Sequence, residues 1–443
     1  MLLPLLDLRS NLATNDKVTQ LVGWTVESTG RGTLSLITNC LATTALCTWV
    51  CIHPRIDPQQ RRRLPHKIVL FAKAVLCPEL IAVEAAQEWT QARRVTCQIR
   101  EHTSEDVHYN HAFYIGMFGL RYRTPQGTKV LWPNQLVWLL EQNLFDWKQR
   151  REWDLTTEII QDKSKADATA KLFALLQSIW FVAQSIMRAT HNLPLAPLES
   201  MTLGYIPLFV VTYIYWWLKP KDVRTPSEVE LPSMTAAQRA TFDDMMVNES
   251  FDDEGEANQK SMWQIWYLTS RIFEKEEEIR VLQRRLDKSR QLYVRHYDRC
   301  PRRGCAECKR LRPGTVKPKK EVVLAHWDPE LYHSRLWPVT CLFGISFGAL
   351  HLASWDTEFP TQVETWLWRS AAITSMGSML LFMQFEKVVV RWSDPLMLVK
   401  ICSPLLYLAS RIIMLGGAIA AFRASDPRLY DTYSVSSYWA HLL

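Results

Sequence analysis

The sequence lacks the short motifs of the common nucleotide- and cofactor-dependent enzymes. It contains no Walker loop, no dinucleotide-binding glycine fingerprint, no serine-hydrolase elbow and no kinase signature. The HExxH pair and the paired aspartate-rich motif of metal-dependent enzymes are absent too. Nucleotide-driven chemistry and serine hydrolysis therefore have no support, and we predict neither a cofactor nor a metal in the functional site.

A secreted disulfide framework is also missing. The ten cysteines are divided between apolar segments and basic stretches, without the spacing of a small disulfide-bonded domain. The first apolar residues, Met1 to Leu6, are too few for the core of a signal peptide, and Asp7 and Arg9 follow them. We therefore expect membrane insertion to begin with a later helix.

What the sequence does have is an alternation of long apolar segments with highly charged ones, which a mean hydropathy of −0.12 averages out. A bilayer core of about 30 Å requires roughly 20 mainly apolar residues in a helix. Six segments meet this requirement: Thr33 to Ile52, Leu172 to Met187, Leu198 to Leu218, Leu336 to Ser354, Thr365 to Phe385 and Ile401 to Phe422. They predict an all-α fold, a polytopic membrane bundle of about six transmembrane helices with additional interfacial and cytoplasmic helices.

A seventh segment, Lys67 to Trp89, is harder to assign. It carries Lys73, Glu79, Glu84 and Glu88, with Pro78 in the middle, and charged side chains are costly in a span that faces lipid. We interpret it as an interfacial or partly embedded helix.

The charges predict the orientation of the bundle. Basic residues cluster between Arg55 and Lys67, directly after the first span, and basic loops stay in the cytoplasm. The net charge of +7 then reflects membrane orientation and predicts no nucleic-acid partner. The predicted order is an extracytoplasmic N-terminus (1–32), a first span (33–52), a cytoplasmic or interfacial segment (53–171), a transmembrane hairpin (172–218), a cytoplasmic loop (219–335), three spans (336–422) and an extracytoplasmic tail (423–443). We expect a multi-pass protein in the bilayer of the endoplasmic reticulum or another endomembrane.

The cytoplasmic loop divides into two parts. Residues Pro226 to Gln259 are acidic and polar, as in a flexible loop, whereas Ser261 to Tyr297 have apolar residues at helical spacing. The second part, the helix 261–297, is a candidate binding site for a protein partner. The end of this helix and the residues after it contain four side chains of the types that bind zinc: His296, Cys300, Cys305 and Cys308. Two interpretations stay open, a zinc site or reduced thiols in a basic segment.

Short stretches over most of the chain outside 226–326 carry a resemblance. They are GRGT at 30–33, LCTW at 46–49, QSIWFVAQ at 177–184 with Arg188, WWLKP at 216–220, and FPT at 359–361 leading to LWR at 367–369. In these stretches the chain resembles a largely uncharacterised fungal family of multi-pass membrane proteins. The resemblance implies a fungal endomembrane or plasma-membrane protein. Some small fungal membrane proteins of comparable style are cyclases of terpenoid and meroterpenoid pathways, which is an analogy of setting and assigns no residue.

Glu79 and Glu84 are the candidate catalytic acids. Partial burial raises the pKa of a carboxyl, so one of them is a candidate general acid for protonating an olefin or epoxide. Glu84 and Glu88 share a helix face because they are four residues apart. The alternative is an interfacial helix whose acids point to water and pair with Lys73 or Arg93.

Three polar residues within the second apolar segment are candidates for substrate binding. Gln177 and Gln184 are seven residues apart, hence on one helix face, and Arg188 is one turn further on. They are suited to line a polar cavity. The alternative is that the amides bond neighbouring helices and Arg188 reaches the membrane surface.

His351 is the fourth candidate for substrate binding. It is near the outer end of its span, and three acids follow it in the next turn: Asp356, Glu358 and Glu364. A histidine beside acids is suited to proton transfer or metal binding. No second histidine is nearby, so an ordinary outer loop without metal is the favoured interpretation.

These observations favour a membrane-embedded enzyme of fungal secondary metabolism. The predicted reaction is an acid-initiated cyclisation or isomerisation of a lipophilic, prenylated substrate in a bundle rich in aromatic side chains. The competing hypothesis is a non-catalytic transporter, receptor or scaffold that recruits a partner through the helix 261–297. Whether the chain is an enzyme stays open at this point.

Overall fold

Helices make up most of the computed structural model, which describes residues 21–26, 31–54, 56, 60–125, 127–164, 168–245, 322–327, 329–385, 387–390 and 395–432. The prediction of a mostly helical fold is confirmed for this part of the chain. The helix predicted for 261–297 and the four candidate zinc ligands lie outside the described residues.

Five of the described helices are long and apolar enough to cross a membrane. They are α1 (Thr33–Cys51), α7 (Ala168–Thr190), α8 (Pro197–Tyr215), α14 (Trp337–His351) and α16 (Met397–Ala420). The sixth predicted span forms α15 (Gln362–Met383), which has the length but is less apolar. It packs against both α14 and α16.

The outer surface of these helices is apolar, as contact with lipid requires. Many leucines and isoleucines on it are more than half exposed, and contiguous exposed apolar surface of this kind marks an interaction site or a membrane contact. Examples from five helices are Leu34, Leu172, Ile179, Ile214, Leu342, Leu398 and Ile412. The described structure is therefore compatible with a membrane protein.

The segment Lys67 to Trp89 differs from the predicted single interfacial helix. It forms two helices, α2 (Gln60–Leu76) and α3 (Pro78–Glu101), separated at Cys77. Pro78 begins α3 because its ring favours the first helical position and it has no N–H to leave unpaired there. Leu80 and Val83 are fully buried, and α3 packs on α8 and α14 inside the bundle.

A small mixed domain, which we call the cap, contradicts a purely α-helical fold. It contains α4 (Tyr109–Gly116), α5 (Pro133–Glu141), α6 (Thr157–Lys163) and α9 (Ala236–Asp244). Its sheet has the order β2-β1-β3, in which β1 (Leu120–Thr124) is antiparallel to β2 (Gly127–Val130) and parallel to β3 (Ser227–Val229). These strands have three to five residues, too few for a clear alternating pattern.

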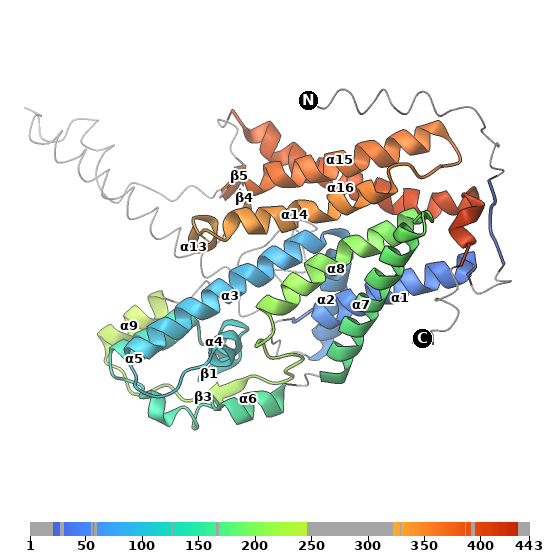
Figure 1. Cartoon of the computed structure of the whole chain (residues 1–443). Coiled ribbons are helices and arrows are strands. Elements are labelled where there is room, and N and C mark those ends of the chain that lie inside the picture. The colour runs from blue at the N-terminus through green and yellow to red at the C-terminus, as the bar shows by residue number, and fades with distance from the viewer. Residues whose placement is uncertain are drawn as a thin grey trace, which may run out of the picture.

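A second, two-stranded sheet pairs β4 (Val322–His326) antiparallel to β5 (Lys387–Val390). The short helix α13 (Pro329–Tyr332) leads from β4 to α14. The sheet contacts α16, and Figure 1 shows it at the end of the bundle where α13 lies.

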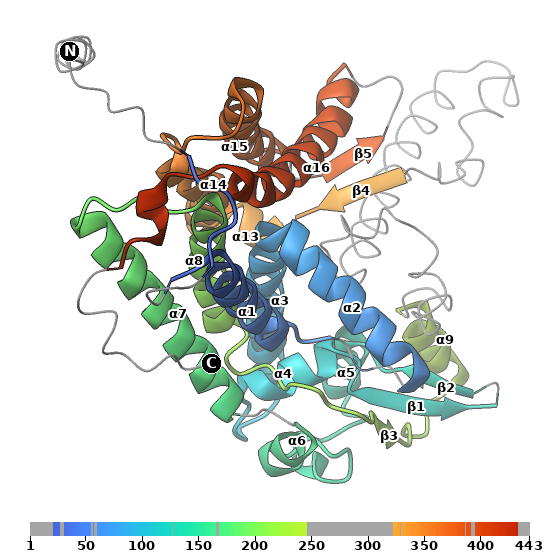
Figure 2. The same cartoon turned by 90° about the vertical axis from the view of Figure 1, so that its right-hand side faces the viewer.

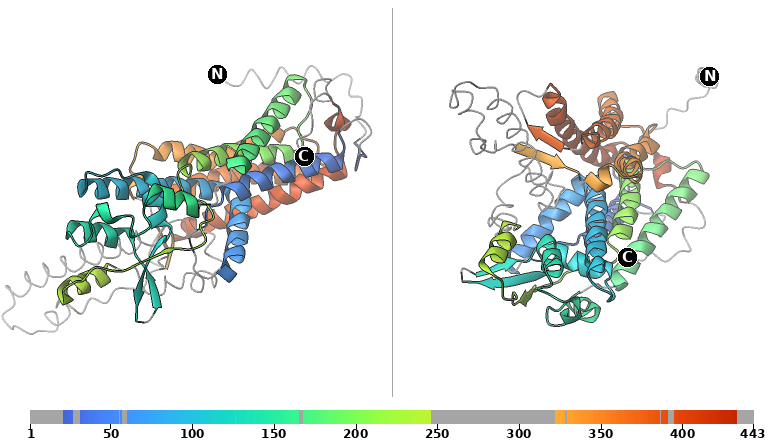
Figure 3. Two further views of the ribbon diagram at one scale, coloured as in Figure 1. Left: turned by 90° about the horizontal axis from the view of Figure 1, so that it is seen from below. Right: turned by 90° about the vertical axis from the view of Figure 1, so that its left-hand side faces the viewer.

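The long helix α3 connects the bundle to the cap. Its first half contacts α8 and α14, and its second half contacts α4 and α5, where Ile99 and Phe113 join the core of the cap. Seen from below, the cap lies at one end of the molecule and the spans extend away from it (Figure 3).

The opposite end gathers the segments that the sequence analysis assigns to one side of the membrane. The start of α1, the α7–α8 turn, the α14–α15 turn and the end of α16 all lie there (Figure 1). Val22 pairs with Ser425, and the hydroxyl of Ser354 donates to that of Ser200 at 2.6 Å. We call this end the distal end; which side of a membrane it faces stays a prediction.

Substituting Gly348 by alanine should destabilise the bundle. A Cβ there would lie 2.4 Å from Met376 Cγ and 3.2 Å from the carbonyl oxygen of Ala372, so α14 and α15 would have to separate. We expect a loss of about 1–3 kcal/mol, measured as a lower melting temperature in detergent. Gly377→Ala is the matched control, because nothing lies within 4 Å of its added Cβ. Equal melting temperatures for the two variants would contradict this packing.

Acid should weaken the cap through His111. Its side chain is buried, its Nδ1 accepts from the N–H of His108, and burial lowers its pKa from 6.5 to about 4. The unfolded chain therefore binds this proton first as the pH falls, and stability is lost between pH 6.5 and about 4. We expect His111→Gln to remove about 2–3 kcal/mol of the acid destabilisation seen in melting curves at pH 7 and pH 4. The exposed His191→Gln should leave the acid response unchanged, and an unchanged response in His111→Gln would contradict the assignment.

Candidate functional site

A cluster of buried ionisable groups surrounds the start of α3. Glu79 is in the first turn of this helix, where the helix dipole favours a carboxylate, and its side chain is 1% exposed. Tyr407 and Arg411 reach it from α16, where they are four residues apart and so on one face. The three residues form the centre of the candidate site.

Two contacts hold the carboxyl group of Glu79. The Tyr407 hydroxyl donates to Oε2 at 2.5 Å, and Arg411 Nη2 lies 3.7 Å from the same oxygen. The Nε of Arg411 donates to the carbonyl oxygen of Leu76 at 2.8 Å, at the C-terminal end of α2. Arg411 thus joins the end of one helix to the start of the next.

Aromatic and imidazole rings complete the cluster. The guanidinium carbon of Arg411 is 3.3 Å from the centroid of the Phe347 ring, a close cation–π contact. The same ring is 4.4 Å from that of His351, whose Nδ1 is 2.6 Å from the Phe347 carbonyl oxygen. His351 is the last residue of α14, at the outer end of its span as the sequence predicts, but its side chain is fully buried.

Several polar atoms of the cluster have no hydrogen-bond partner among the described residues. They are Glu79 Oε1, His351 Nε2 and both terminal nitrogens of Arg411. Buried polar atoms in this state are rare and often mark a functional position or an ordered water. A cavity of about 10 Å³ lies beside Glu79, lined also by Thr340, Phe343 and Gly344, and it has room for one water molecule at most.

The structure separates Glu84 from Glu79. Lys73 donates to Glu84 Oε2 at 2.6 Å, and Lys219 donates to Glu88 Oε2 at 2.5 Å. Glu84 is only partly buried and is not in the cluster, because it is paired with a lysine of α2. The Lys73–Glu84 pair fits the alternative, but Glu88 pairs with Lys219 instead of Arg93, and Glu79 is buried instead of pointing to water.

The amides of α7 also lie apart from Glu79. Gln177 Nε2 donates to Asn39 Oδ1 at 3.1 Å and to Thr43 Oγ1 at 2.9 Å, which bonds α7 to α1. Gln184 is half-buried on the same helix. Neither residue lines the cavity beside Glu79, and the contacts of Gln177 fit the interhelical alternative.

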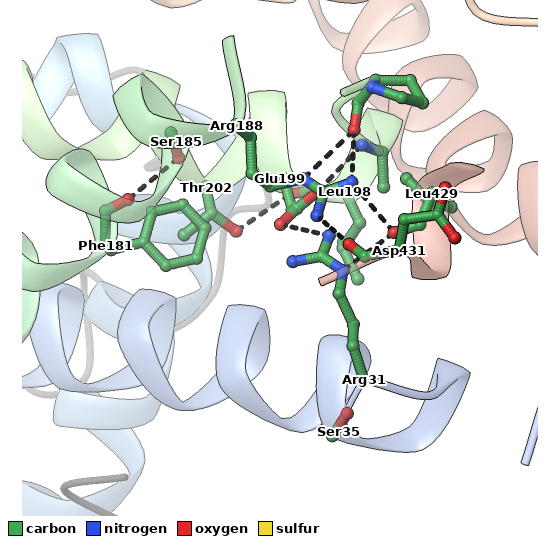
Figure 4. Close-up of polar contacts among 12 residues, drawn as sticks. Arg31, Ser35, Phe181, Ser185, Arg188, Leu198, Glu199, Thr202, Leu429 and Asp431 are labelled. Atoms are coloured by element: carbon green, nitrogen blue, oxygen red, sulfur yellow. Dashed lines mark hydrogen bonds and ion pairs between the residues drawn. The ribbon is translucent and has the colours of Figure 1, made fainter. Parts of the chain in front are cut away.

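Arg188 is a structural clamp at the distal end. Its guanidinium donates to the carbonyl oxygens of Pro194, Arg428, Leu429 and Asp431 over 2.9–3.3 Å. Figure 4 shows Arg31 approaching the same segment, and its Nε donates to the Leu429 carbonyl oxygen at 2.9 Å. Arg188 therefore fixes the C-terminal segment of the described chain instead of shaping a pocket at Glu79.

Two acids near the outer turns have partners other than His351. Glu364 pairs with Arg423, and Glu199 pairs with Arg31 at 2.8 Å. No group of three histidine, cysteine, aspartate or glutamate residues is suited to hold a metal within the part of the chain that the structure describes.

The sequence analysis overlooked Tyr407 and Arg411. The signal for Arg411 was present, because it is the single charged residue inside the predicted span Ile401 to Phe422, where a charge must face protein or water. Nothing in the sequence separates Tyr407 from the other tyrosines. Its role depends on the packing of α16 against α3, some 330 residues away along the chain.

The fold and this cluster define a helical-bundle protein with an apolar exterior and buried charges at its centre. The chain belongs to a family of unknown function (DUF8562), whose model matches residues 3–121, 149–254 and 323–404. This agrees with the predicted membership of an uncharacterised family. No curated protein and no solved structure matches the chain.

Substituting Arg188 by methionine should release the C-terminal segment. Its carbonyl oxygens would lose a charged donor, which we expect to cost at least about 2 kcal/mol locally. Hydrogen exchange in a peptide covering 427–432 should accelerate in this variant. Arg423→Met is the control, because the Arg423 side chain is 62% exposed. Unchanged exchange in the Arg188 variant would contradict the clamp.

Proposed function

We propose that the protein is a membrane-embedded enzyme that protonates a lipophilic, prenylated substrate with Glu79 and so starts a cyclisation or isomerisation. The observation that carries the proposal is the state of the Glu79 carboxyl group. One oxygen is held by Tyr407 and Arg411, while the other, Oε1, is buried without a hydrogen-bond partner among the described residues and borders a small cavity.

The surroundings of Glu79 suit a reversible proton transfer. Removal from water favours the neutral carboxyl, whereas Arg411 and the Tyr407 hydroxyl favour the carboxylate. In the proposed step the O–H bond of Glu79 breaks, a C–H bond forms at an alkene carbon, and a carbocation and a carboxylate result. The cation then loses a different proton, which gives the cyclic or isomerised product, and this proton returns to the Glu79 carboxylate, so that the acid is regenerated.

Neighbouring groups support both charges of this step. Arg411 and Tyr407 stabilise the carboxylate, and the ring of Phe343, which lines the cavity, offers a π face to a cation. The cavities at Glu79 and Pro78 measure about 10 and 20 Å³, so α8 and α14 must move apart to admit a substrate. In this proposal Glu84, Gln177, Gln184 and Arg188 position helices and take no part in the chemistry.

Glu79→Gln should abolish product formation, with a loss of at least about 100-fold. The assay uses membranes from cells expressing the full chain, supplied with prenylated phenols or polyene epoxides and analysed by mass spectrometry. Glu84→Gln is the matched control on the same helix and should retain activity, because Glu84 pairs with Lys73 outside the cluster. Full activity in Glu79→Gln, with its melting temperature unchanged, would remove the proposed acid.

A non-catalytic receptor, scaffold or transporter is the alternative, and the closed packing around Glu79 favours it. The two hypotheses differ in what they require of the cytoplasmic loop. Removing residues 247–320, while keeping β3 and α9, should spare the enzyme activity, whereas a scaffold would lose its partner. The endomembrane location and the fungal pathway are parts of the same proposal.

A further inference from the structure

A second, larger cavity lies between the cap and the bundle. It has a volume of about 430 Å³, within the usual range for ligand sites. Its walls come from the end of α3, the start of α4, α6, the start of α7 and the residues that follow α8. Figure 2 shows the start of α7 beside α4 and α6, at the bundle end that joins the cap. It is separate from the Glu79 cluster and shares no lining residue with the cavity there.

The charge of this cavity has one sign. Arg100, Lys171 and Lys219 contribute to its lining, and no aspartate or glutamate does so within the part of the chain that the structure describes. Lys219 is neutralised by Glu88 and also donates to the His53 carbonyl oxygen. Arg100 and Lys171 are left as cations without a carboxylate partner among the described residues, so the cavity favours an anion.

Lys171 is held in place by aromatic rings. Its ammonium group is 5.5 Å from the Tyr213 ring and 5.7 Å from the Trp217 ring, and the side chain is half-buried. Arg100 is fixed in turn, because its Nε and Nη2 both donate to the Val107 carbonyl oxygen. Two positioned cations on different elements form a receptor for a phosphate group, which accepts hydrogen bonds on several oxygens.

The start of α4 adds to the same potential. His108, Tyr109 and Asn110 line the cavity at the N-terminal end of this eight-residue helix, where the helix dipole is positive. Arg100 of α3, Lys171 of α7 and the N-terminal end of α4 therefore all contribute positive potential to the cavity.

The cavity continues onto the lipid-facing surface. Trp217 and Leu218 belong to its lining and are 61% and 51% exposed. Next to Lys171, Leu172 and Phe173 are each 56% exposed at the start of a candidate span. A ligand whose head is in the cavity can therefore lay an apolar tail along α7 and α8. This pairing of an anionic head with an apolar tail is the chemistry of an amphiphile.

We propose that this cavity binds an anionic phospholipid from the leaflet that surrounds the cap end of the bundle. The phosphate lies between Lys171 and Arg100, and an acyl chain packs against Trp217 and Leu218. A prenyl diphosphate has the same chemistry but comes from solution, so the test separates the two sources. The proposal does not depend on the reaction assigned to Glu79.

The test measures lipid bound to the full chain in nanodiscs containing phosphatidylcholine with or without phosphatidylglycerol, by native mass spectrometry after release into detergent. Phosphatidylglycerol should be retained preferentially. Lys171→Gln and Arg100→Gln should each lower this preference by about five-fold, as expected for one cation at an anionic membrane surface. Lys171→Arg should retain it, which separates the loss of charge from a failure to fold.

Lys400→Gln is the matched control, because Lys400 also lies over an aromatic ring, that of Phe385 at 5.3 Å, but does not line the cavity. It should bind phosphatidylglycerol as the wild type does. Equal retention of both lipids by the wild type, or an equal loss in Lys400→Gln, would overturn the proposal. Binding of farnesyl diphosphate without any preference for phosphatidylglycerol would overturn the assignment to a membrane lipid.

Discussion

The arrangement of the bundle depends on the contacts that Arg411 makes. A guanidinium enclosed among helices must find compensating groups, and Arg411 finds them in the Leu76 carbonyl oxygen, the Glu79 carboxyl and the Phe347 ring. These partners belong to the end of α2, the start of α3 and the middle of α14. One side chain of α16 therefore fixes the break between α2 and α3. Since α3 continues into the cap, the contacts of Arg411 also fix the position of the cap relative to the bundle.

The break itself has a local origin and a distant consequence. Pro78 cannot continue the ladder of α2, so the last carbonyl groups of α2 have no partner within the helix. Within water such groups would be solvated, but here a charged side chain from the far end of the sequence replaces the solvent. The segment Lys67 to Trp89 has a polar composition, and it lies inside the bundle because its polar groups bind polar or charged side chains of other helices.

The long apolar helices of this architecture follow from sequence alone. The length of the apolar segments predicts α1, α7, α8, α14 and α16, because a helix satisfies all its backbone hydrogen bonds within the segment. The sheet of the cap was not predictable in this way, because the paired residues of β1 and β3, such as Leu120 and Ser227, are 107 positions apart and neither strand has a clear alternating pattern. Only part of the candidate site was predicted from the sequence: Glu79 was a candidate because it is an acid in an apolar segment. Its partners Tyr407 and Arg411 are brought to it only by the packing of α16 on α3.

The polar residues of α3 and α7 also show why a shared face on one helix is weak evidence for a functional site. Gln177, Gln184 and Arg188 share a face, yet Gln177 bonds α1 while Arg188 binds the C-terminal segment. Glu84 and Glu88 share a face as well, and each pairs with a different lysine. Helix geometry predicts which residues are neighbours, but the elements on the other side decide what they do.

The clamp at the distal end has a consequence for biogenesis. Arg188 is synthesised as part of α7, yet three of its carbonyl partners are residues 428, 429 and 431, more than 200 positions later in the chain. The turn between α7 and α8 therefore cannot reach its final packing until the ribosome has passed residue 431. A chain truncated before residue 428 would leave Arg188 with a buried charge and without three of its carbonyl partners.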